Sequence, residues 1–257
     1  MHNFEYYTPT KVIFGKDAEL KAGEDIKAYG AKKTLVHFGG KSAQKSGLLE
    51  RVCQSLKDAG VDYITFGGAQ PNPLLSLVYE GIKLCRENNV DYILAVGGGS
   101  VIDSAKAIAL GVANNDADVW DIFLRKYMPK AALPVSAVVT IAAAGSEMSD
   151  SAVITKDEGL LKRGFNSNLI RCKTAFMNPE LTYTVPEYQT AAGIVDILMH
   201  TMDRYFVRGT MALTDQIAEG LMRTVIEQAH ILINQPDSYE ARAEIMWAGS
   251  LSHNGLT

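Results

Sequence analysis

Residues 91–106 read Asp91-Tyr92-Ile93-Leu94-Ala95-Val96-Gly97-Gly98-Gly99-Ser100-Val101-Ile102-Asp103-Ser104-Ala105-Lys106, and this stretch decides the fold. A buried strand runs into a glycine turn, and a helix follows directly. Glycines let the backbone approach an anion closely, and the N–H groups and positive dipole end of the helix then point at it. A plain turn would need only Ser100 as helix N-cap and Asp103 as the acid of a capping box. The local pattern leaves both interpretations open, and they are compatible.

The composition is that of an ordinary globular protein. The 257 residues are 47% hydrophobic and 21% charged, which suffices for one large or two modest domains. The formal net charge of −4 gives no basic excess for nucleic-acid binding. We see neither an apolar run that could span a membrane nor a secretory signal. The three cysteines are odd in number and far apart, which predicts reduced, packed thiols in the cytoplasm.

Strand and helix patterns alternate through the first half of the chain. Each predicted strand is mostly apolar, and each predicted helix has apolar residues at helical spacing. Strands joined through helices imply a parallel sheet covered on both faces. The predicted strands are 12–14, 34–38, 62–66, 91–96 and 137–141, and the predicted helices are 18–29, 48–59, 76–88 and 101–109.

Turns of small residues follow four of these strands. Ligands bind beyond the carboxyl ends of parallel strands, so we expect these turns to share one rim and to form a shallow cleft for a nucleotide-like ligand. The turns are 39–42, 67–68, 97–100 and 142–146.

The pattern changes near Val185. Thr184-Val185-Pro186-Glu187 has the form of a capping box with proline in the first turn, and helical patterns follow over 189–207, 212–234 and 239–253. No strand signal returns. The sequence therefore predicts an α/β domain over residues 1–185 and the start of an all-helical domain over residues 186–257.

The loop after the second strand bears on the choice of cofactor. Dinucleotide sites often place an acid there to bind the adenosine ribose, whereas this loop offers Gly39, Gly40, Lys41 and Ser42. A 2′-phosphate is attracted by a lysine and repelled by an acid. The loop therefore favours NADP(H) over NAD(H), with a solvated surface loop as the alternative.

Asp196 and His200 stand four residues apart in a helical pattern and so share one face. Their apolar neighbours predict that this face is buried. A carboxylate and an imidazole one turn apart can each give one ligand atom to a divalent ion. A hydrogen-bonded Asp–His pair within a core is the alternative, and for an isolated pair it is the more common one.

Assembled in this order, residues 97–106, 140–149 and 196–200 resemble the iron-containing (group III) alcohol dehydrogenases. Within that family the chain is most similar to the NADPH- or NADH-dependent butanol dehydrogenases and aldehyde reductases, through segments 66–73, 120–123, 144–148 and 176–184. The resemblance covers essentially the whole chain. It implies a Rossmann-like parallel sheet domain followed by an all-helical domain, incomplete here, in a dehydroquinate synthase-like architecture. The family's active site lies between the two domains.

The resemblance also implies a set of site residues. The glycine turn corresponds to the family's pyrophosphate loop, and Ala144 stands where relatives often carry a hydroxyl, so that contact is not carried over. The implied cofactor-binding residues are Gly39, Gly40, Lys41, Ser42, Asn72, Gly97, Gly98, Gly99, Ser100, Asp103, Thr140, Ser149 and Lys162.

The family's metal, usually Fe²⁺ or Zn²⁺, takes one aspartate and three histidines. Asp196 and His200 match the first two, the others lie beyond residue 257 in relatives, and neither His230 nor His253 matches a ligand position. No further catalytic residue is assigned.

The resemblance thus implies a cytoplasmic homodimer that transfers hydride between NAD(P)H and an aldehyde or primary alcohol. The alternatives are a truncated, non-catalytic dinucleotide-binding fragment and a glycerol dehydrogenase-like relative. For residues 1–257 alone we expect dinucleotide binding with little or no turnover.

Overall fold

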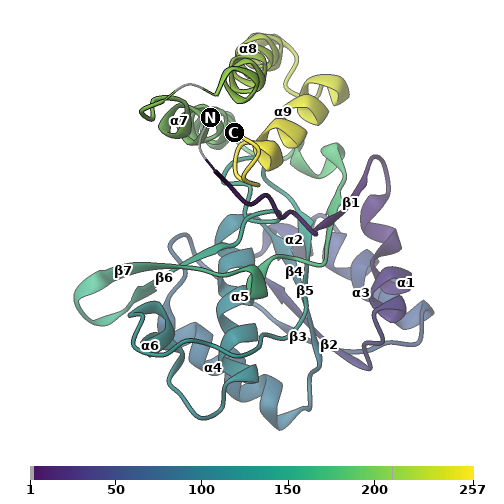
Figure 1. The fold of residues 1–257 in the computed structure, drawn as a ribbon. Coiled ribbons are helices and arrows are strands. Elements are labelled where there is room, and N and C mark those ends of the chain that lie inside the picture. The colour runs from purple at the N-terminus through teal and green to yellow at the C-terminus, as the bar shows by residue number, and fades with distance from the viewer. Residues whose placement is uncertain (1–2, 210) are drawn as a thin grey trace.

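A computed structural model describes residues 3–209 and 211–257. Within this part of the chain, a parallel sheet with helices on both faces lies below a layer of three helices (Figure 1). The strands are β1 (Lys11–Phe14), β2 (Lys33–Phe38), β3 (Asp62–Phe66), β4 (Tyr92–Gly97), β5 (Val135–Val139), β6 (Ser151–Lys156), β7 (Leu161–Asn166) and β8 (Thr174–Met177). The α-helices are α1 (Ala22–Ala28), α2 (Ser42–Lys45), α3 (Leu48–Asp58), α4 (Leu75–Glu87), α5 (Gly99–Ala113), α6 (Val119–Phe123), α7 (Glu187–Tyr205), α8 (Ala212–Asn234) and α9 (Tyr239–Leu251). The 3-10 helices are η1 (Ala18–Lys21), η2 (Glu158–Leu160), η3 (Asn168–Ile170) and η4 (Pro179–Thr182).

The main sheet has the strand order β1-β8-β5-β4-β2-β3, and every neighbouring pair is parallel. The predicted parallel sheet is therefore confirmed. Parallel strands end at the same edge, so the segments after β2, β4, β5 and β8 are brought to one rim. This rim faces α7–α9 (Figure 1).

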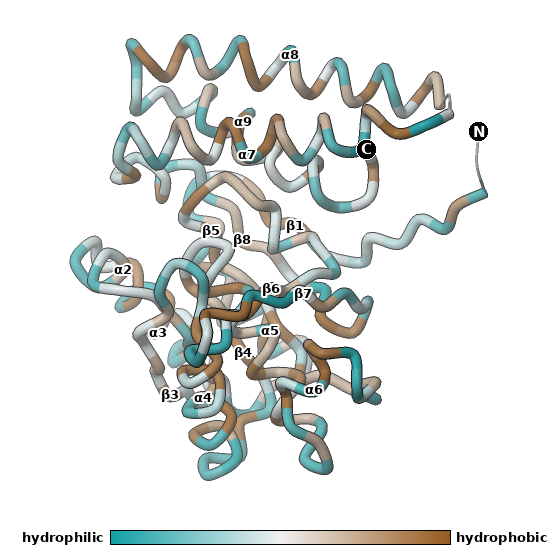
Figure 2. The backbone as a smooth tube through the Cα atoms, turned by 90° about the vertical axis from the view of Figure 1, so that its left-hand side faces the viewer, coloured by the Kyte–Doolittle hydropathy of each residue, from teal (hydrophilic) through white to brown (hydrophobic). Residues whose placement is uncertain are grey.

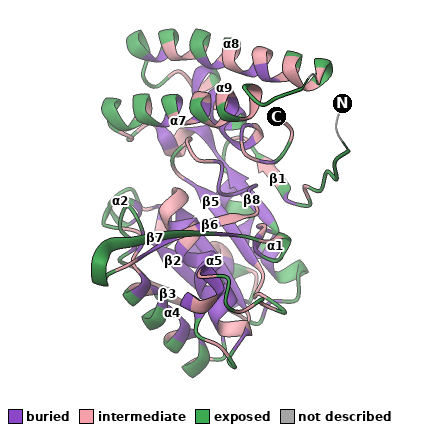
Figure 3. Ribbon diagram, turned by 60° about the vertical axis from the view of Figure 1, so that its left-hand side comes forward, coloured by how far each residue is buried: buried purple, intermediate pink, exposed green. Residues whose placement is uncertain are grey.

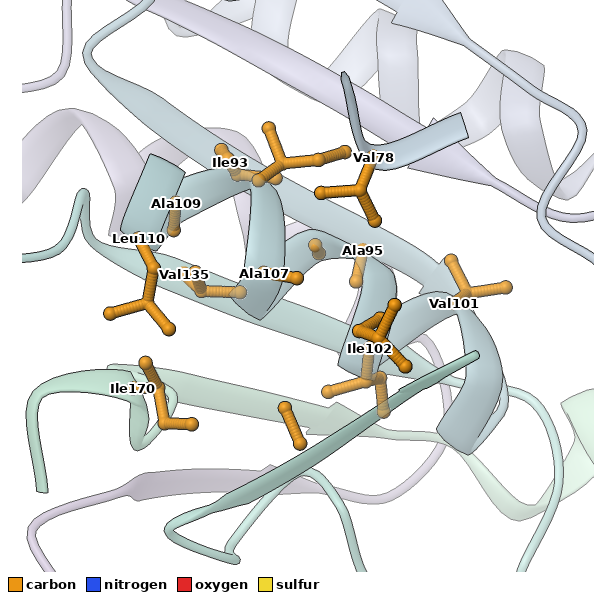
Figure 4. Close-up of a cluster of buried hydrophobic side chains, with 14 of the residues drawn as sticks. Val78, Ile93, Ala95, Val101, Ile102, Ala107, Ala109, Leu110, Val135 and Ile170 are labelled. Carbon is orange, nitrogen blue, oxygen red and sulfur yellow. The ribbon is translucent and has the colours of Figure 1, made fainter. Parts of the chain in front are cut away.

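Strand β4 shows how the sheet is held between two hydrophobic clusters. Ile93 and Ala95 point to the face covered by α4 and α5, while Leu94 and Val96 point to the face covered by α1 and α3. Figure 4 shows the first cluster, in which Ile102 of α5 packs close to the strand residues. Ile102 is fully buried, and burial of such a side chain stabilises the fold by about 1.5–3 kcal/mol.

Strands β6 and β7 form an antiparallel hairpin that the sequence analysis missed. Its turn passes through Gly159 at φ 73°, and the hairpin projects from the side of the molecule (Figure 1). In β7 only Phe165 is buried. A strand with so little apolar surface carries almost no alternating hydrophobic signal.

Helices α7, α8 and α9 pack around their own cluster, which includes Ile197, Leu221, Val225 and Ile245. Helix α8 begins and ends at the predicted residues, and its outer face is exposed (Figure 3). The predicted capping box before α7 is wrong, because the N-cap is Pro186 and no side chain caps the helix.

Candidate active site

The glycine turn opens directly into α5. The N-cap of α5 is Gly98, and no side chain accepts a hydrogen bond from the first turn of the helix. The capping role predicted for Ser100 and Asp103 is therefore wrong: Ser100 lies inside the first turn, and Asp103 Oδ2 accepts a hydrogen bond from the Val153 backbone N–H of β6. The first N–H groups of the helix thus remain available to an anion.

A cleft of about 760 Å³ lies over this helix end. That volume is within the range of small-molecule and cofactor pockets, about 300–1,000 Å³. Eight of the predicted cofactor residues line it: Gly39, Gly40, Ser42, Gly97, Gly98, Gly99, Ser100 and Thr140. The predicted turns 39–42 and 97–100 therefore converge at the cleft, whereas no residue of the predicted turns 67–68 and 142–146 belongs to its described lining. After β3 and β5 the lining residues are instead 69–71 and 140–141, and the segment after β8 adds Asn178 and Leu181.

The remaining predicted cofactor residues do not belong to the described lining of this cleft. Lys41 is exposed at the start of α2. Lys162 Nζ donates a hydrogen bond to Asn72 Oδ1 at 2.8 Å, which ties β7 to the loop before α4. Ser149 is buried, and its Oγ accepts a hydrogen bond from the Ser151 backbone N–H.

Asp103 lies behind the glycine turn, on the side of the helix that faces β6. Burial raises the pKa of its carboxyl to about 6, while Lys106 and hydrogen bonds from Val153 and Ser146 act in the opposite direction. A carboxyl in that state titrates just below neutral pH. Its charge is therefore set by the packing of β6 and the neighbouring loop against α5.

The lining of the cleft includes an ion pair between the buried Glu19 and the partly exposed Arg51, which the sequence analysis missed. Glu19 is 1% exposed, and its carboxylate accepts hydrogen bonds from Arg51 at 3.2 Å and from Asn178 at 3.0 Å. Asp17 and Glu180 line the same cleft. No motif marks Glu19 or Arg51, because they reach the cleft from η1 and α3 rather than from the loops at the strand ends. Asn178 was detectable, since it directly follows an apolar strand.

Asp196 and His200 lie one turn apart on α7, with Oδ1 and Nε2 3.6 Å from each other. Their side chains are 43% and 26% exposed, so the predicted burial of this face is wrong. His200 Nδ1, however, is buried and has no hydrogen-bond partner among the described residues. A carboxylate oxygen and an imidazole nitrogen on one helix face form a donor pair that suits a divalent transition metal. The described residues hold no cluster of three or more such side chains suited to a metal ion.

His253 lies against His200, a contact that no sequence pattern indicated. Its Nδ1 donates a hydrogen bond to the Ala144 carbonyl at 2.8 Å, and its ring meets the His200 ring edge-to-face at 4.5 Å between centroids. Burial, together with the neighbouring His200 and Arg204, lowers the pKa of His253 to about 4. His253 thus connects α7 to the segment after β5.

Two models of known protein families match the chain, one over the part with the glycine turn and one over the part with Asp196 and His200. The model of the iron-containing alcohol dehydrogenases matches residues 9–179, and the model of their C-terminal domain matches residues 190–257. The chain belongs to the iron-containing alcohol dehydrogenase family. No helix within residues 3–209 and 211–257 has the length and apolarity needed to cross a membrane.

Several members of this family are similar to the whole chain. A probable NADH-dependent butanol dehydrogenase 1 of Bacillus subtilis is 44% identical over 257 residues, covering 100% of this chain and 66% of that protein. The NADPH-dependent aldehyde reductase YqhD of Escherichia coli is 38% identical and is likewise covered over 66% of its length. The crystal structure of NADH-dependent butanol dehydrogenase A from Thermotoga maritima superposes with a TM-score of 0.97 at 40% identity, covering 100% of this chain and 64% of that one. The chain thus spans about two thirds of the length of these relatives.

Proposed function

We propose that the chain binds a nicotinamide dinucleotide and takes part in hydride transfer between it and a small aldehyde or primary alcohol. The observation that carries this proposal is the first turn of α5, which no side chain caps and which opens into the cleft. Oriented N–H groups and the helix dipole suit the pyrophosphate of a dinucleotide. The names of the butanol dehydrogenase and aldehyde reductase relatives support the substrate class.

The proposed dinucleotide contacts include every residue that the sequence analysis assigned. Gly97–Ser100 would receive the pyrophosphate, and the loop of residues 39–42 would lie beside the adenosine. The other proposed contacts are Asn72, Asp103, Thr140, Ser149 and Lys162, of which Thr140 lines the cleft. Lys162 is already held by Asn72, so it would reach the cofactor only if this hydrogen bond is exchanged.

We propose Asp196 and His200 as two ligands of a divalent metal, Fe²⁺ or Zn²⁺. The unpartnered Nδ1 of His200 and the facing Oδ1 and Nε2 atoms support this assignment. A divalent ion bound there would polarise a carbonyl oxygen as a Lewis acid. The glycine turn would fix the dinucleotide, and α7 would hold the two ligand side chains toward the space between the sheet and the helices. Holding the hydride donor and the hydride acceptor in the right geometry makes a bimolecular reaction effectively unimolecular.

A negative charge introduced at Ser100 tests the dinucleotide site. Glu in the first turn of a helix is favourable to the helix dipole, so Ser100→Glu should leave the free energy of unfolding unchanged or slightly higher. The same charge would repel a pyrophosphate, and we expect the affinity for NADPH to fall by at least about tenfold, or about 1.4 kcal/mol.

Ser100→Ala is the matched control and should bind within about threefold of the wild-type chain, because a neutral hydrogen bond contributes about 0.5–1.5 kcal/mol. Titration of NADPH fluorescence measures both affinities. Equal NADPH affinities of the Glu and Ala variants would contradict the proposal that the pyrophosphate binds at the N-terminus of α5.

We propose NADP(H) as the preferred dinucleotide, because residues 39–42 carry no acid and include Lys41. One observation favours NAD(H) instead: Asp17, Glu19 and Glu180 line the same cleft, and a carboxylate can accept a hydrogen bond from a ribose 2′-hydroxyl. Relatives of both kinds are named. Comparison of the dissociation constants for NADPH and NADH decides between them, and Lys41→Ala should weaken only NADPH binding if the first proposal holds.

We also propose the division into an α/β domain over residues 1–185 and a helical domain over residues 186–257. The two clusters beside the sheet and the third cluster within α7–α9 support it. A homodimer in the cytoplasm is proposed from the family resemblance. In support, β1 is an edge strand that pairs only with β8 among the described strands. The average mass from light scattering tests the dimer.

A further inference from the structure

Lys106 is a charged side chain in the middle of a hydrophobic helix face. It lies two turns into α5 and is 0% exposed. A buried ammonium must find hydrogen-bond acceptors, because its transfer from water is otherwise costly. Lys106 finds three: its Nζ donates to the backbone carbonyls of Ser146 at 2.7 Å, Ser149 at 2.8 Å and Ser151 at 2.9 Å.

All three carbonyls belong to the connection between β5 and β6, which we call the bridging loop (residues 140–150), or to its first neighbour, Ser151. This loop has no regular secondary structure. A loop of this kind lacks a ladder of backbone hydrogen bonds to fix its shape. The three donors of one ammonium therefore gather backbone groups that would otherwise need separate partners.

The near side of the bridging loop packs against the glycine turn. A side-chain carbon added at Gly99 would come within 3.2 Å of Ser146 Oγ and 3.5 Å of Ala144 Cβ. Thr140 and Ile141, the first residues of the loop, line the cleft. The position of the loop thus determines one wall of the proposed dinucleotide site.

The far side of the loop supports the helical layer. Glu147 Oε1 accepts a hydrogen bond from Ser250 Oγ of α9 at 2.5 Å, and the Ala144 carbonyl accepts the bond from His253. Gly193 of α7 packs so closely that an added Cβ would lie 2.3 Å from the Ala142 carbonyl oxygen. The bridging loop therefore contacts the glycine turn, α7 and α9.

We propose that Lys106 is a positioning residue, whose ammonium holds the bridging loop in the shape that joins the dinucleotide cleft to the helices above it. Lys106 touches neither the cleft nor the Asp196–His200 pair. It acts by holding the bridging loop, which contacts the glycine turn on one side and helices α7 and α9 on the other. The part of this inference that concerns affinity rests on the proposed dinucleotide binding, whereas the part that concerns loop order does not.

The test compares Lys106→Met with Ile108→Ala in the full 257-residue chain. Both residues are fully buried in α5, but Ile108 packs against α4, where its Cδ1 lies 2.4 Å from a Cβ added at Gly81. We expect Lys106→Met to raise amide hydrogen exchange in residues 142–151, and in α7 and α9, by about tenfold, and to weaken NADPH binding by a similar factor. Ile108→Ala should destabilise the fold without a selective effect on the loop or on affinity.

Three outcomes decide the matter. Loop exchange in Lys106→Met that equals that of Ile108→Ala overturns the inference. Wild-type NADPH affinity in Lys106→Met overturns its affinity part, whereas no binding by the wild-type chain overturns the proposed function and leaves the exchange comparison valid. If Lys106→Met does not fold, Lys106→Arg replaces it: a planar guanidinium cannot reproduce three bonds from one atom, so the loop should still exchange faster, and unchanged exchange overturns the inference.

Discussion

At the scale of single residues, His37 links the sheet to α5 through a neutral imidazole. Its Nδ1 donates to the Phe66 carbonyl at 2.9 Å, and its Nε2 accepts from Ser104 Oγ at 3.0 Å. His37 is 0% exposed, and burial lowers its pKa from 6.5 to about 4. The folded chain therefore resists the protonation that the unfolded chain accepts.

The consequence is a loss of stability at acid pH. Between pH 6.5 and about 4 the unfolded state binds more protons at this site, so the free energy of unfolding falls as the pH falls. The full shift corresponds to about 3 kcal/mol, which is fully lost only below pH 4. Urea unfolding at several pH values across this range measures how steeply the free energy of unfolding depends on pH. His37→Gln should remove the contribution of His37 to this pH dependence. An unchanged slope in the variant would assign the acid sensitivity elsewhere.

Asp103 provides a check of opposite sign. Its pKa is raised to about 6, so the folded state holds its proton longer than the unfolded state does. Its contribution to stability is therefore present at low pH and is lost as the pH rises from about 4 to 6. The free energy of unfolding of the wild-type chain minus that of Asp103→Asn should therefore fall as the pH rises over this interval. A difference that rises instead would show that Asp103 ionises at or below its ordinary pKa in the folded chain.

The same residues show how far the sequence could predict the site. The glycine turn, Ser42 and Thr140 were placed correctly at the cleft, because strand-end position alone brings them to the rim. The capping role of Asp103 failed because β6 offers its Val153 N–H, and that contact depends on a hairpin that the sequence did not reveal. Glu19 and Arg51 could not be found either, since their meeting depends on how α3 packs against η1.

At the scale of elements, Gly193 sets the distance between α7 and the bridging loop. A Cβ at this position would lie 2.3 Å from the Ala142 carbonyl oxygen, and backbone cannot move aside cheaply. We expect Gly193→Ala to destabilise the chain by about 1–3 kcal/mol, as overpacking of a tight contact usually does. Chemical denaturation followed by circular dichroism measures the change.

Gly220 is the matched control, because it also lies within a helix but has no atom within 4 Å of an added Cβ. Gly220→Ala should stabilise α8 by up to about 1 kcal/mol, through the better helix propensity of alanine. If both substitutions stabilise the chain, α7 does not rest on the loop as closely as described.

Elements with strong apolar patterns were predicted well, and those that depend on partners were not. Strand β3 and helix α8 have the predicted bounds. The hairpin β6–β7 and strand β8 were missed: β7 is mostly exposed, and β8 has only four residues. The order β1-β8-β5-β4-β2-β3 was also beyond reach, because crossovers rather than local pattern determine which strands become neighbours.

At the scale of the whole molecule, two unequal layers meet through both polar and apolar contacts, the latter including Met246 of α9 in a cluster beside the sheet and the Phe14–Trp247 ring pair. The sheet has a large cluster on each face, whereas α7–α9 enclose a smaller one. Helix α8 is the outermost element in Figure 2 and packs against α7 and α9. Leu213 and Ile233 on this helix are 65% and 72% exposed. These features place α8 in the least protected part of the described chain.

We therefore expect the helical layer to open at a lower free energy than the sheet, since opening free energies follow the buried apolar contacts of each unit. In amide hydrogen exchange, α8 should exchange fastest and α5 slowest among the helices of eight or more residues. NADPH at about 100 times its dissociation constant should stabilise the part that binds it by about 2.7 kcal/mol and slow exchange in α5 accordingly. Exchange in α8 should stay unchanged, because helices that open alone do not sense a ligand bound at the sheet. Equal slowing of α5 and α8 would show that the two layers unfold as one cooperative unit, with the bridging loop strong enough to couple them fully.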